Sequence, residues 1–308
     1  MKKYIKIMRM DHWIKQLFIM PGIICAYLLS DSNLSFFRFV FGFLSTCLIA
    51  SANYVINEYL DAEFDKFHPT KKLRSVVQED VKGCVVWLLW IGLTVCGIAL
   101  SAFVNIQFSV TLLSLWVMGI LYNVKPIRTK DIVLLDVLSE SINNAIRLLL
   151  GWFIVSSQTL PPSSAIFGYW MGGAFLMATK RFAEYRMIGN PGLAGQYRKS
   201  FAYYTETSLV LSAFFYAMCS TFFLGVFLIK YRVELLLFMP ILIGLFCYYF
   251  YLSFQSDSSV QKPEKLYQEK GLMTYCVLIC ISFVTLMYID IPWLHMFTST
   301  ILLEMGVG

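Results

Sequence analysis

Nine long apolar runs restrict the fold of this chain more than any other feature of its sequence. A helix of about 20 apolar residues crosses the ~30 Å hydrocarbon core of a bilayer. The runs centre on residues 17–30, 36–57, 84–104, 106–122, 132–156, 163–183, 207–229, 233–253 and 271–289. Hydrophobic residues make up 58% of the 308 residues and charged residues 14%, which excludes an ordinary soluble domain. We therefore predict an all-α integral membrane protein with nine transmembrane helices.

The sequence predicts one transmembrane unit. The first run is followed by further runs and lacks a small-residue cleavage site, so we expect it to be retained rather than removed as a signal peptide. Eight cysteines fall almost entirely inside the runs without a CxxC pair, which predicts free thiols rather than disulfides or a zinc site. We expect residues 1–308 to form a single transmembrane domain.

Basic residues alternate between the two ends of the predicted helices. Lys and Arg cluster before the first run, after the second, fourth and sixth runs, and before the ninth, whereas the other connections are nearly bare. By the positive-inside rule, the N-terminus is cytoplasmic and the C-terminus external, which requires an odd number of spans. The net charge of +6 is therefore explained by topology, and no nucleic-acid partner is expected.

An acidic stripe ends the second run. In "NEYLDAEFD", Asn57, Glu58, Asp61 and Asp65 fall at helical angles of about 0°, 100°, 40° and 80°. Ionisable groups at membrane depth are costly and mark an ion or substrate pathway. A solvated helix end is the alternative, but oxygen ligands in single file suit Mg²⁺, which takes one or two carboxylates together with substrate phosphate.

A basic segment follows this stripe directly. Pro69 disfavours helical geometry at His68, so "HPTKKLR" is expected to form a loop whose cations lie over the acidic residues. Lys72 and Arg74 belong to this loop. A positive-inside cluster alone would explain the bases without the acids. Acids for a metal beside bases for phosphate oxygens indicate a diphosphate site.

A second polar file lies in the fifth run. Asp136, Glu140, Asn143 and Arg147 fall within about 60° of one another on a helix that is otherwise apolar. An internal ion pair that locks two helices together is the alternative to a shared cavity. The loop before this run adds four further candidates, which are Tyr122, Lys125, Arg128 and Lys130.

The sixth run ends in "ATKRFAEYR". Lys180 and Glu184 are four residues apart and therefore adjacent on one helical face, with Arg181 beside them. Taken alone, this spacing predicts a salt bridge at the end of the helix.

These motifs together resemble the UbiA superfamily of intramembrane prenyltransferases. That family has a nine-helix bundle and two cytoplasmic motifs, NDxxDxxxD and DxxxD, whose acids bind Mg²⁺ and diphosphate. The first motif is matched at Asn57, Asp61 and Asp65, with Glu58 as a conservative departure. The second motif is replaced by "KRFAE", which puts Lys180 where an acid would hold a second ion. The resemblance covers nearly the whole chain.

Within the superfamily, the chain is similar to the decaprenyl-phosphate phosphoribosyltransferases. The similar segments are "MDHWIKQ" with Lys15, the pattern DxxHPxKxxR from Asp65 to Arg74, the spacing of Asp136 and Arg147, "KRFAE", and "PEKL" before the ninth run. The chain departs from that branch in Gln16 instead of Asn, in Ser75 instead of Pro, and in the longer loop "KPIRTKD".

The resemblance implies Mg²⁺-dependent transfer of a phosphoribosyl group from 5-phosphoribosyl 1-diphosphate (PRPP) to a polyprenyl phosphate, for cell-envelope polysaccharide synthesis. The site would face the cytoplasm from a bacterial cytoplasmic membrane. The implied metal ligands are Asn57, Glu58, Asp61 and Asp65, and the implied catalytic residues are Asp61, Asp65, Lys180 and Glu184. The implied substrate-binding residues are Lys15, His68, Lys72, Arg74, Tyr122, Lys125, Arg128, Lys130, Asp136, Glu140, Arg147 and Arg181.

Two other functions remain open on the sequence alone. A prenyltransferase that takes an isoprenyl diphosphate and an aromatic acceptor would need two bound metals, against which "KRFAE" argues. A transporter would place its polar residues near the midplane on broken helices, whereas the acids here lie at one end of their helix. The sequence does not decide whether the protein forms a homo-oligomer.

Overall fold

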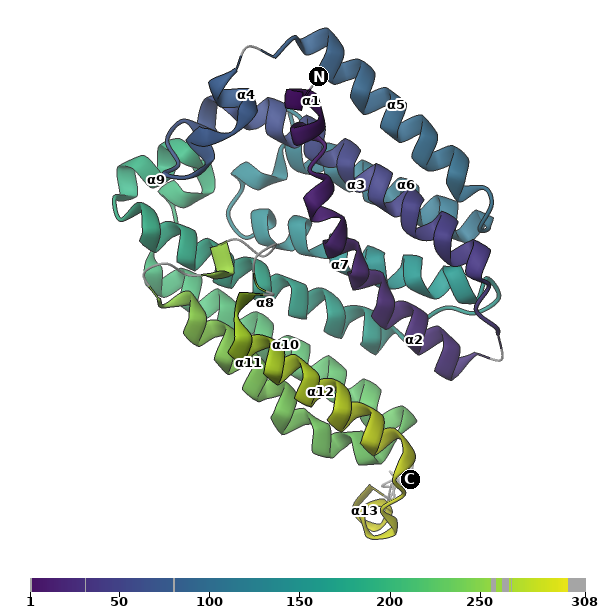
Figure 1. The fold of residues 1–308 in the computed structure, drawn as a ribbon. Helices are drawn as coiled ribbons and strands as arrows, with labels where there is room; N and C mark the ends of the chain where they lie inside the picture. The colour runs from purple at the N-terminus through teal and green to yellow at the C-terminus, as the bar shows by residue number, and fades with distance from the viewer. Residues whose placement is uncertain are drawn as a thin grey trace, which may run out of the picture.

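The protein is a bundle of long helices that lie side by side in an open arc (Figure 1). The computed structural model describes residues 2–30, 32–79, 81–255, 259–261, 266 and 268–298. Its long helices are α2 (Met20–Leu29), α3 (Phe36–Asp65), α5 (Gly83–Ser101), α6 (Ile106–Asn123), α7 (Leu135–Val155), α8 (Ser163–Ile188), α10 (Glu206–Tyr231), α11 (Met239–Ser253) and α12 (Lys270–Tyr288). The predicted apolar runs are thus helical in the described parts of the chain.

Two of these helices are preceded by helical segments that lengthen them. α1 (Lys2–Ile7) and the 3₁₀ segment η1 (Met10–Ile19) lead into α2, and η5 (Val233–Phe238) leads into α11. Together with these extensions, seven helical segments are long and apolar enough to cross a membrane. α7 and α8, which carry more polar residues, are not among the seven.

Short elements gather at the two ends of the bundle. The 3₁₀ segment η2 (Lys71–Leu73) precedes α4 (Ser75–Gln78) between α3 and α5, and η4 (Lys199–Ala202) follows α9 (Pro191–Tyr197) between α8 and α10. The 3₁₀ segment η3 (Thr129–Asp131) lies between α6 and α7. α4 and α9 are at one end of the bundle, while α13 (Pro292–Thr298) is at the other end (Figure 1). The 3₁₀ segment η6 (Ser259–Gln261) follows α11.

Glycines let the N-terminal segment pack tightly on α7. A Cβ atom on Gly22 would come within 2.0 Å of the Leu148 carbonyl oxygen, and one on Gly151 within 2.0 Å of the Ile19 carbonyl oxygen. Small residues permit such close approach of helices in membranes. The buried apolar cluster around this contact includes Trp152, and it fixes η1 and α2 against α7.

Candidate functional site

A cavity of about 570 Å³ opens between η1, α3, α6, α7 and α8. Its wall carries twice as many cations as carboxylates. The cations are Arg9, Lys15, Lys71, Arg74, Arg147, Lys180, Arg181 and Arg198, and the carboxylates are Asp61, Asp65, Glu140 and Glu184. Apolar side chains, among them Phe18, Ala50, Leu115 and Met177, line the same cavity. The site therefore suits a ligand that combines several negative charges with an apolar part.

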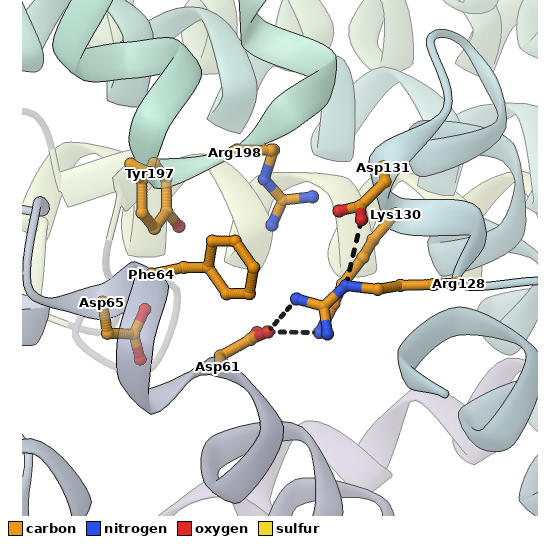
Figure 2. A pocket seen from close by; sticks show the side chains of 8 residues that line it. All are labelled: Asp61, Phe64, Asp65, Arg128, Lys130, Asp131, Tyr197 and Arg198. Atoms are coloured by element: carbon orange, nitrogen blue, oxygen red, sulfur yellow. Dashed lines mark hydrogen bonds and ion pairs between the residues drawn. The ribbon is translucent and has the colours of Figure 1, made fainter. Parts of the chain in front are cut away.

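α3 brings three of the predicted metal-site residues to the cavity wall. Asn57, Asp61 and Asp65 all line it, because residues four apart on a helix lie on one face. Asp61 Oδ1 accepts from Arg128 Nη2 at 2.9 Å and from Lys130 Nζ at 2.5 Å. Figure 2 shows both cations converging on Asp61. The two bases that were predicted in the loop before the fifth run thus contact the acidic stripe directly.

Arg128 and Lys130 line a smaller hollow beside the main cavity (Figure 2). This hollow shares Asp61, Asp65 and Arg198 with the cavity. Burial lowers the pKa of Lys130 to about 8, although Asp61 opposes the shift. Lys130 therefore remains mostly protonated at neutral pH, and together with Arg128 and Arg198 it balances the three carboxylates of the hollow, which are Asp61, Asp65 and Asp131.

The loop after α3 folds over the acidic residues, as the sequence predicts. Arg74 forms an ion pair with Asp65. His68 is 2% exposed, and its Nδ1 accepts from the backbone N–H groups of Thr70 and Lys71 at 3.2 Å each. Burial and the nearby Lys71 lower the pKa of His68 to about 3, so the ring is neutral and shapes the loop.

Glu58 points away from the cavity. Its carboxylate lies 3.2 Å from Arg9 Nε, and it is not among the residues that line the cavity. The angle of about 100° between Glu58 and Asn57 on the helix turns Glu58 toward the N-terminal segment. Glu58, which the sequence resemblance implies as a metal ligand, is therefore paired with Arg9 of the N-terminal segment.

Arg181 joins the carboxylates of α7 and α8. It is 1% exposed, forms an ion pair with Glu140, and lies 3.1 Å from Glu184 and 3.6 Å from Asp136. Glu184 is also 2.9 Å from Lys71 Nζ. The salt bridge predicted between Lys180 and Glu184 is therefore wrong, because Arg181 and Lys71 already occupy the Glu184 carboxylate.

Two cavity cations differ from the rest. In the part of the chain that the structure describes, neither Arg147 nor Lys180 has a carboxylate within 4.0 Å. Arg147 Nε donates to Gln16 Oε1 at 2.8 Å, and its Nη1 donates to Asn144 Oδ1 at 3.2 Å. Neither cation therefore forms a direct ion pair with a carboxylate among the described residues.

Several predicted substrate-binding residues line the cavity and others do not. Lys15, His68, Arg74, Tyr122, Glu140, Arg147 and Arg181 line it. Lys72 and Lys125 are exposed and line neither hollow. Asp136 is 0% exposed and accepts from Tyr204 at 2.8 Å and from Ser200 at 3.1 Å, behind the cavity wall. Pro263, Glu264 and Lys265 of "PEKL" lie outside the described residues.

Comparison with known proteins places these residues in a family context. Residues 18–275 match the UbiA prenyltransferase family. The chain belongs to that family. It is 26% identical over 211 residues to a decaprenyl-phosphate phosphoribosyltransferase of Mycolicibacterium smegmatis, which covers 67% of this chain and 63% of that protein. It is 25% identical over 150 residues to an uncharacterized protein of Sinorhizobium fredii, which covers 49% of this chain and 28% of that protein. Each match thus spans less than two thirds of the curated relative.

Solved UbiA structures share the fold. A UbiA homolog from Archaeoglobus fulgidus bound to GPP and Mg²⁺ superposes with a TM-score of 0.69 at 17% identity, over 92% of this chain and 99% of that one. A UbiA homolog from Aeropyrum pernix gives a TM-score of 0.64 at 12% identity, over 89% and 98%. The predicted UbiA-like helical bundle is confirmed.

The α3 file has the donor chemistry for a divalent cation of the UbiA type. Asn57, Asp61 and Asp65 offer one amide oxygen and two carboxylates on one wall of the cavity. Mg²⁺ is usually held by one or two carboxylates together with substrate phosphate oxygens. These residues therefore fit a metal that a phosphorylated substrate completes.

Three residues of the site, which are Asn123, Tyr197 and Arg198, were not predicted as site residues from the sequence. Tyr197 ends α9 and Arg198 follows it, and both line the cavity. Lys71 bonds to the Tyr197 hydroxyl, and Asn123 Oδ1 accepts from Lys130 Nζ at 2.8 Å. The segment "QYRKS" carries the available signal for Tyr197 and Arg198, an aromatic residue beside two cations in a short connection.

Proposed function

We propose that this UbiA family member transfers the 5-phosphoribosyl group of PRPP to a polyprenyl phosphate. The product would be a 5-phosphoribosyl-phosphopolyprenol for cell-envelope polysaccharide synthesis. The alignment with a decaprenyl-phosphate phosphoribosyltransferase over 67% of the chain supports this choice.

The charge of the cavity is the observation that carries the proposal. Each of its four carboxylates is already paired with a cation, and an excess of cations remains. PRPP brings a diphosphate and a 5-phosphate, and the acceptor brings another phosphate. A donor with a single diphosphate and a neutral acceptor would leave several half-buried cations of the cavity uncompensated, which is costly.

The part of the cavity beside the C-terminal end of α3, here called the α3 end, would hold the donor's diphosphate. Asn57, Asp61 and Asp65 would bind Mg²⁺, which supplies charge neutralisation on the departing diphosphate. Arg74, Arg128 and Lys130 would turn from the carboxylates to the diphosphate oxygens and stabilise the charge that develops on them. The Nε2–H of His68 would add a neutral donor.

The acceptor would attack C1 of the ribose without a strong general base, because a phosphate is already an anion. Direct displacement inverts C1, so an α donor gives a β product. The polyprenyl tail would stay in an apolar groove that opens to the bilayer, since each CH₂ drawn into water costs ~0.8 kcal/mol.

The proposal includes a membrane arrangement. Nine spans, which are the seven apolar segments together with α7 and α8, would put the N-terminus and the α3 end of the cavity on the cytoplasmic side of a bacterial cytoplasmic membrane. Residues 1–308 would act as a single domain. PRPP is a water-soluble metabolite, so a cavity that opens to the cytoplasm suits this donor.

A prenyltransferase that uses an isoprenyl diphosphate is the second candidate. The apolar part of the cavity favours it, and the Archaeoglobus fulgidus homolog was solved with GPP. Lys180 and Arg181 stand against it, because they put positive charge where this chemistry would need a second carboxylate-bound metal.

An assay with purified protein, Mg²⁺, polyprenyl phosphate and radiolabelled PRPP tests the function. We expect label to enter the organic phase with the wild type and to fall at least about a hundredfold with Asp61→Asn, a typical loss for one strong electrostatic contact to the transition state. Glu63→Gln is the matched control, since Glu63 is an exposed acid on the same helix outside the cavity. Consumption of an isoprenyl diphosphate with an aromatic acceptor, and no transfer from PRPP, would overturn the proposal in favour of the second candidate.

A further inference from the structure

The cavity contains two kinds of cation that differ in their partners. Lys71, Arg74 and Arg181 are each held by carboxylates in the structure. Arg147 and Lys180 line the same cavity without such a partner among the described residues. Both side chains are half-buried, and a cation that is partly removed from water is disfavoured unless an anion compensates it. These two positions therefore call for an anion that the protein does not supply.

Arg147 lies deeper in the bundle than the carboxylates. On α7 it is seven residues beyond Glu140, which places it about 10 Å further from the α3 end of the cavity at ~1.5 Å per residue. The seven-residue spacing keeps both side chains on one face. An anion bound at Arg147 would thus be distinct from one bound beside Asp61 and Asp65.

Helix geometry directs Lys180 and Arg147 toward the same part of the cavity, which both residues line. The last turns of α8 contact the first turns of α7 through Arg181 and Glu140, so the two helices run antiparallel. Helical side chains tilt toward the N-terminus of their own helix, which directs Arg147 and Lys180 toward each other from the two sides. The bond from Arg147 to Asn144 follows this direction.

The surroundings of this pair are apolar on the side away from the carboxylates. Ala50 precedes Asn57 and Asp61 on α3, Leu115 precedes Tyr122 on α6, and Met177 precedes Lys180 on α8, and all three apolar residues line the cavity. The pair therefore lies where the polar wall gives way to the apolar one, which is where the head of a lipid would meet its chain.

We infer that Arg147 and Lys180 form the subsite for the phosphate of the lipid acceptor. The inference rests on the proposed function, which supplies a lipid phosphate as acceptor. The shared chemistry is a phosphate monoester, and the ribose 5-phosphate of the donor is the other source of that group. The apolar wall favours the lipid.

Direct binding tests the subsite without any transfer reaction. Purified protein in nanodiscs is titrated with a polyprenyl monophosphate, with the matching polyprenol, with PRPP and with ribose 5-phosphate. We expect the wild type to bind the monophosphate at least about tenfold more tightly than the polyprenol, as hydrogen bonds between charged groups allow. Arg147→Gln and Lys180→Gln should each remove most of that preference and change PRPP affinity less than about threefold.

Controls separate charge from folding. Arg147→Lys should keep most of the preference, and Arg186→Gln should keep all of it, because Arg186 lies on α8 outside the cavity with its side chain 39% exposed. Lys180→Gln carries the test if Arg147→Gln does not fold, since Arg147 also binds Gln16.

Three results would overturn the subsite. They are a wild type that does not distinguish the monophosphate from the polyprenol, variants that keep the preference, and variants that weaken ribose 5-phosphate or PRPP as much as the lipid. A wild type that binds the lipid phosphate through Arg147 but never accepts PRPP leaves the subsite standing and overturns the proposed donor. Transfer from PRPP, together with variants that keep the lipid preference, overturns the subsite and leaves the proposed donor standing.

Discussion

Single charged side chains in this protein have two different tasks. Arg181 is 1% exposed and contacts three carboxylates on two helices, so it neutralises charge that the fold itself buries. Lys180, its neighbour in the chain, points into the cavity and contacts no carboxylate in the described residues. Adjacent residues on α8 therefore separate a structural role from the ligand-binding role that we propose.

Replacing Arg181 by Gln should be strongly destabilising. The change would leave Glu140 without its cation and reduce the compensation of Asp136 and Glu184, and breaking a buried ion pair in this way costs about 3–5 kcal/mol. We expect a loss of that size in the free energy of unfolding, measured by denaturant titration in micelles.

Arg186→Gln is the comparison for this measurement. Its pair with Glu206 spans 3.8 Å between two exposed side chains, so its removal should change stability by less than about 1 kcal/mol. Equal effects of the two substitutions would contradict the role that we assign to Arg181.

At the scale of elements, the packing of η1 on α7 sets the position of Arg147. Gln16 on η1 accepts from Arg147, and Ile19 contacts Gly151 one turn further along α7. The two contacts lie next to each other in the same interface. A change in the contact between η1 and α7 should therefore alter the position of Arg147 in the cavity wall.

Gly151→Ala should destabilise the protein by about 1–3 kcal/mol, the usual cost of overpacking. The new methyl group would meet the Ile19 carbonyl oxygen at 2.0 Å and push η1 away from α7. We expect a lower unfolding midpoint together with weaker binding of the lipid phosphate. Gly92→Ala on α5 is the matched control, because nothing lies within 4 Å of its added Cβ atom. A Gly151→Ala protein as stable as Gly92→Ala would refute the tight contact.

The docking of α13 should depend on pH. His295 Nε2 lies 2.9 Å from Glu234 Oε1 and 3.2 Å from Asp290 Oδ1, and Arg232 is 3.5 Å from the other oxygen of Glu234. The hydrogen bond with Glu234 raises the pKa of His295 above its usual 6.5, with help from Asp290. A raised pKa means that the contact is fully stabilising below pH 6.5 and is lost as the pH rises through the raised value.

Hydrogen–deuterium exchange of the segment from residue 289 to residue 298 measures this effect. After correction for intrinsic exchange rates, protection should be higher at pH 6 than at pH 8.5 in the wild type, and independent of pH in His295→Gln. Equal wild-type protection at both pH values would exclude a protonated His295 as the contact.

At the scale of the whole molecule, the topology that we propose makes the two ends of the bundle accessible from opposite sides. Lys72 and Gln158 are both exposed. Lys72 lies in the connection between α3 and α5, and Gln158 lies in the connection between α7 and α8 at the opposite end of the bundle. In intact cells, a membrane-impermeant maleimide should label Gln158→Cys and should label Lys72→Cys only after the membrane is opened. The parent protein gives the background from its own cysteines, and the opposite pattern would invert the orientation.

Much of the architecture could be predicted from the sequence because hydrocarbon imposes a simple length rule on apolar helices. The helical file of Asn57, Asp61 and Asp65 followed from spacing alone, and the structure has it on one wall of the cavity. The partners could not be predicted in the same way. Glu58 and Lys180 each lie next to a residue of the site, but neither has the partner that the sequence predicts. The partner of each side chain depends on how the neighbouring helices are rotated, and the spacing within one helix does not determine that rotation.

The cations of the cavity and of the hollow beside it come from two kinds of element, which bears on how a UbiA enzyme can be altered. Lys71, Arg74, Arg128, Lys130 and Arg198 come from connections at one end of the bundle, whereas Arg147 and Lys180 stand on long helices. In our proposal, the first group handles the water-soluble donor and the second group handles the lipid. Loops can be exchanged with little disturbance to a helical framework. A designer could therefore graft the connections of another UbiA enzyme onto this bundle to change the sugar while keeping the lipid.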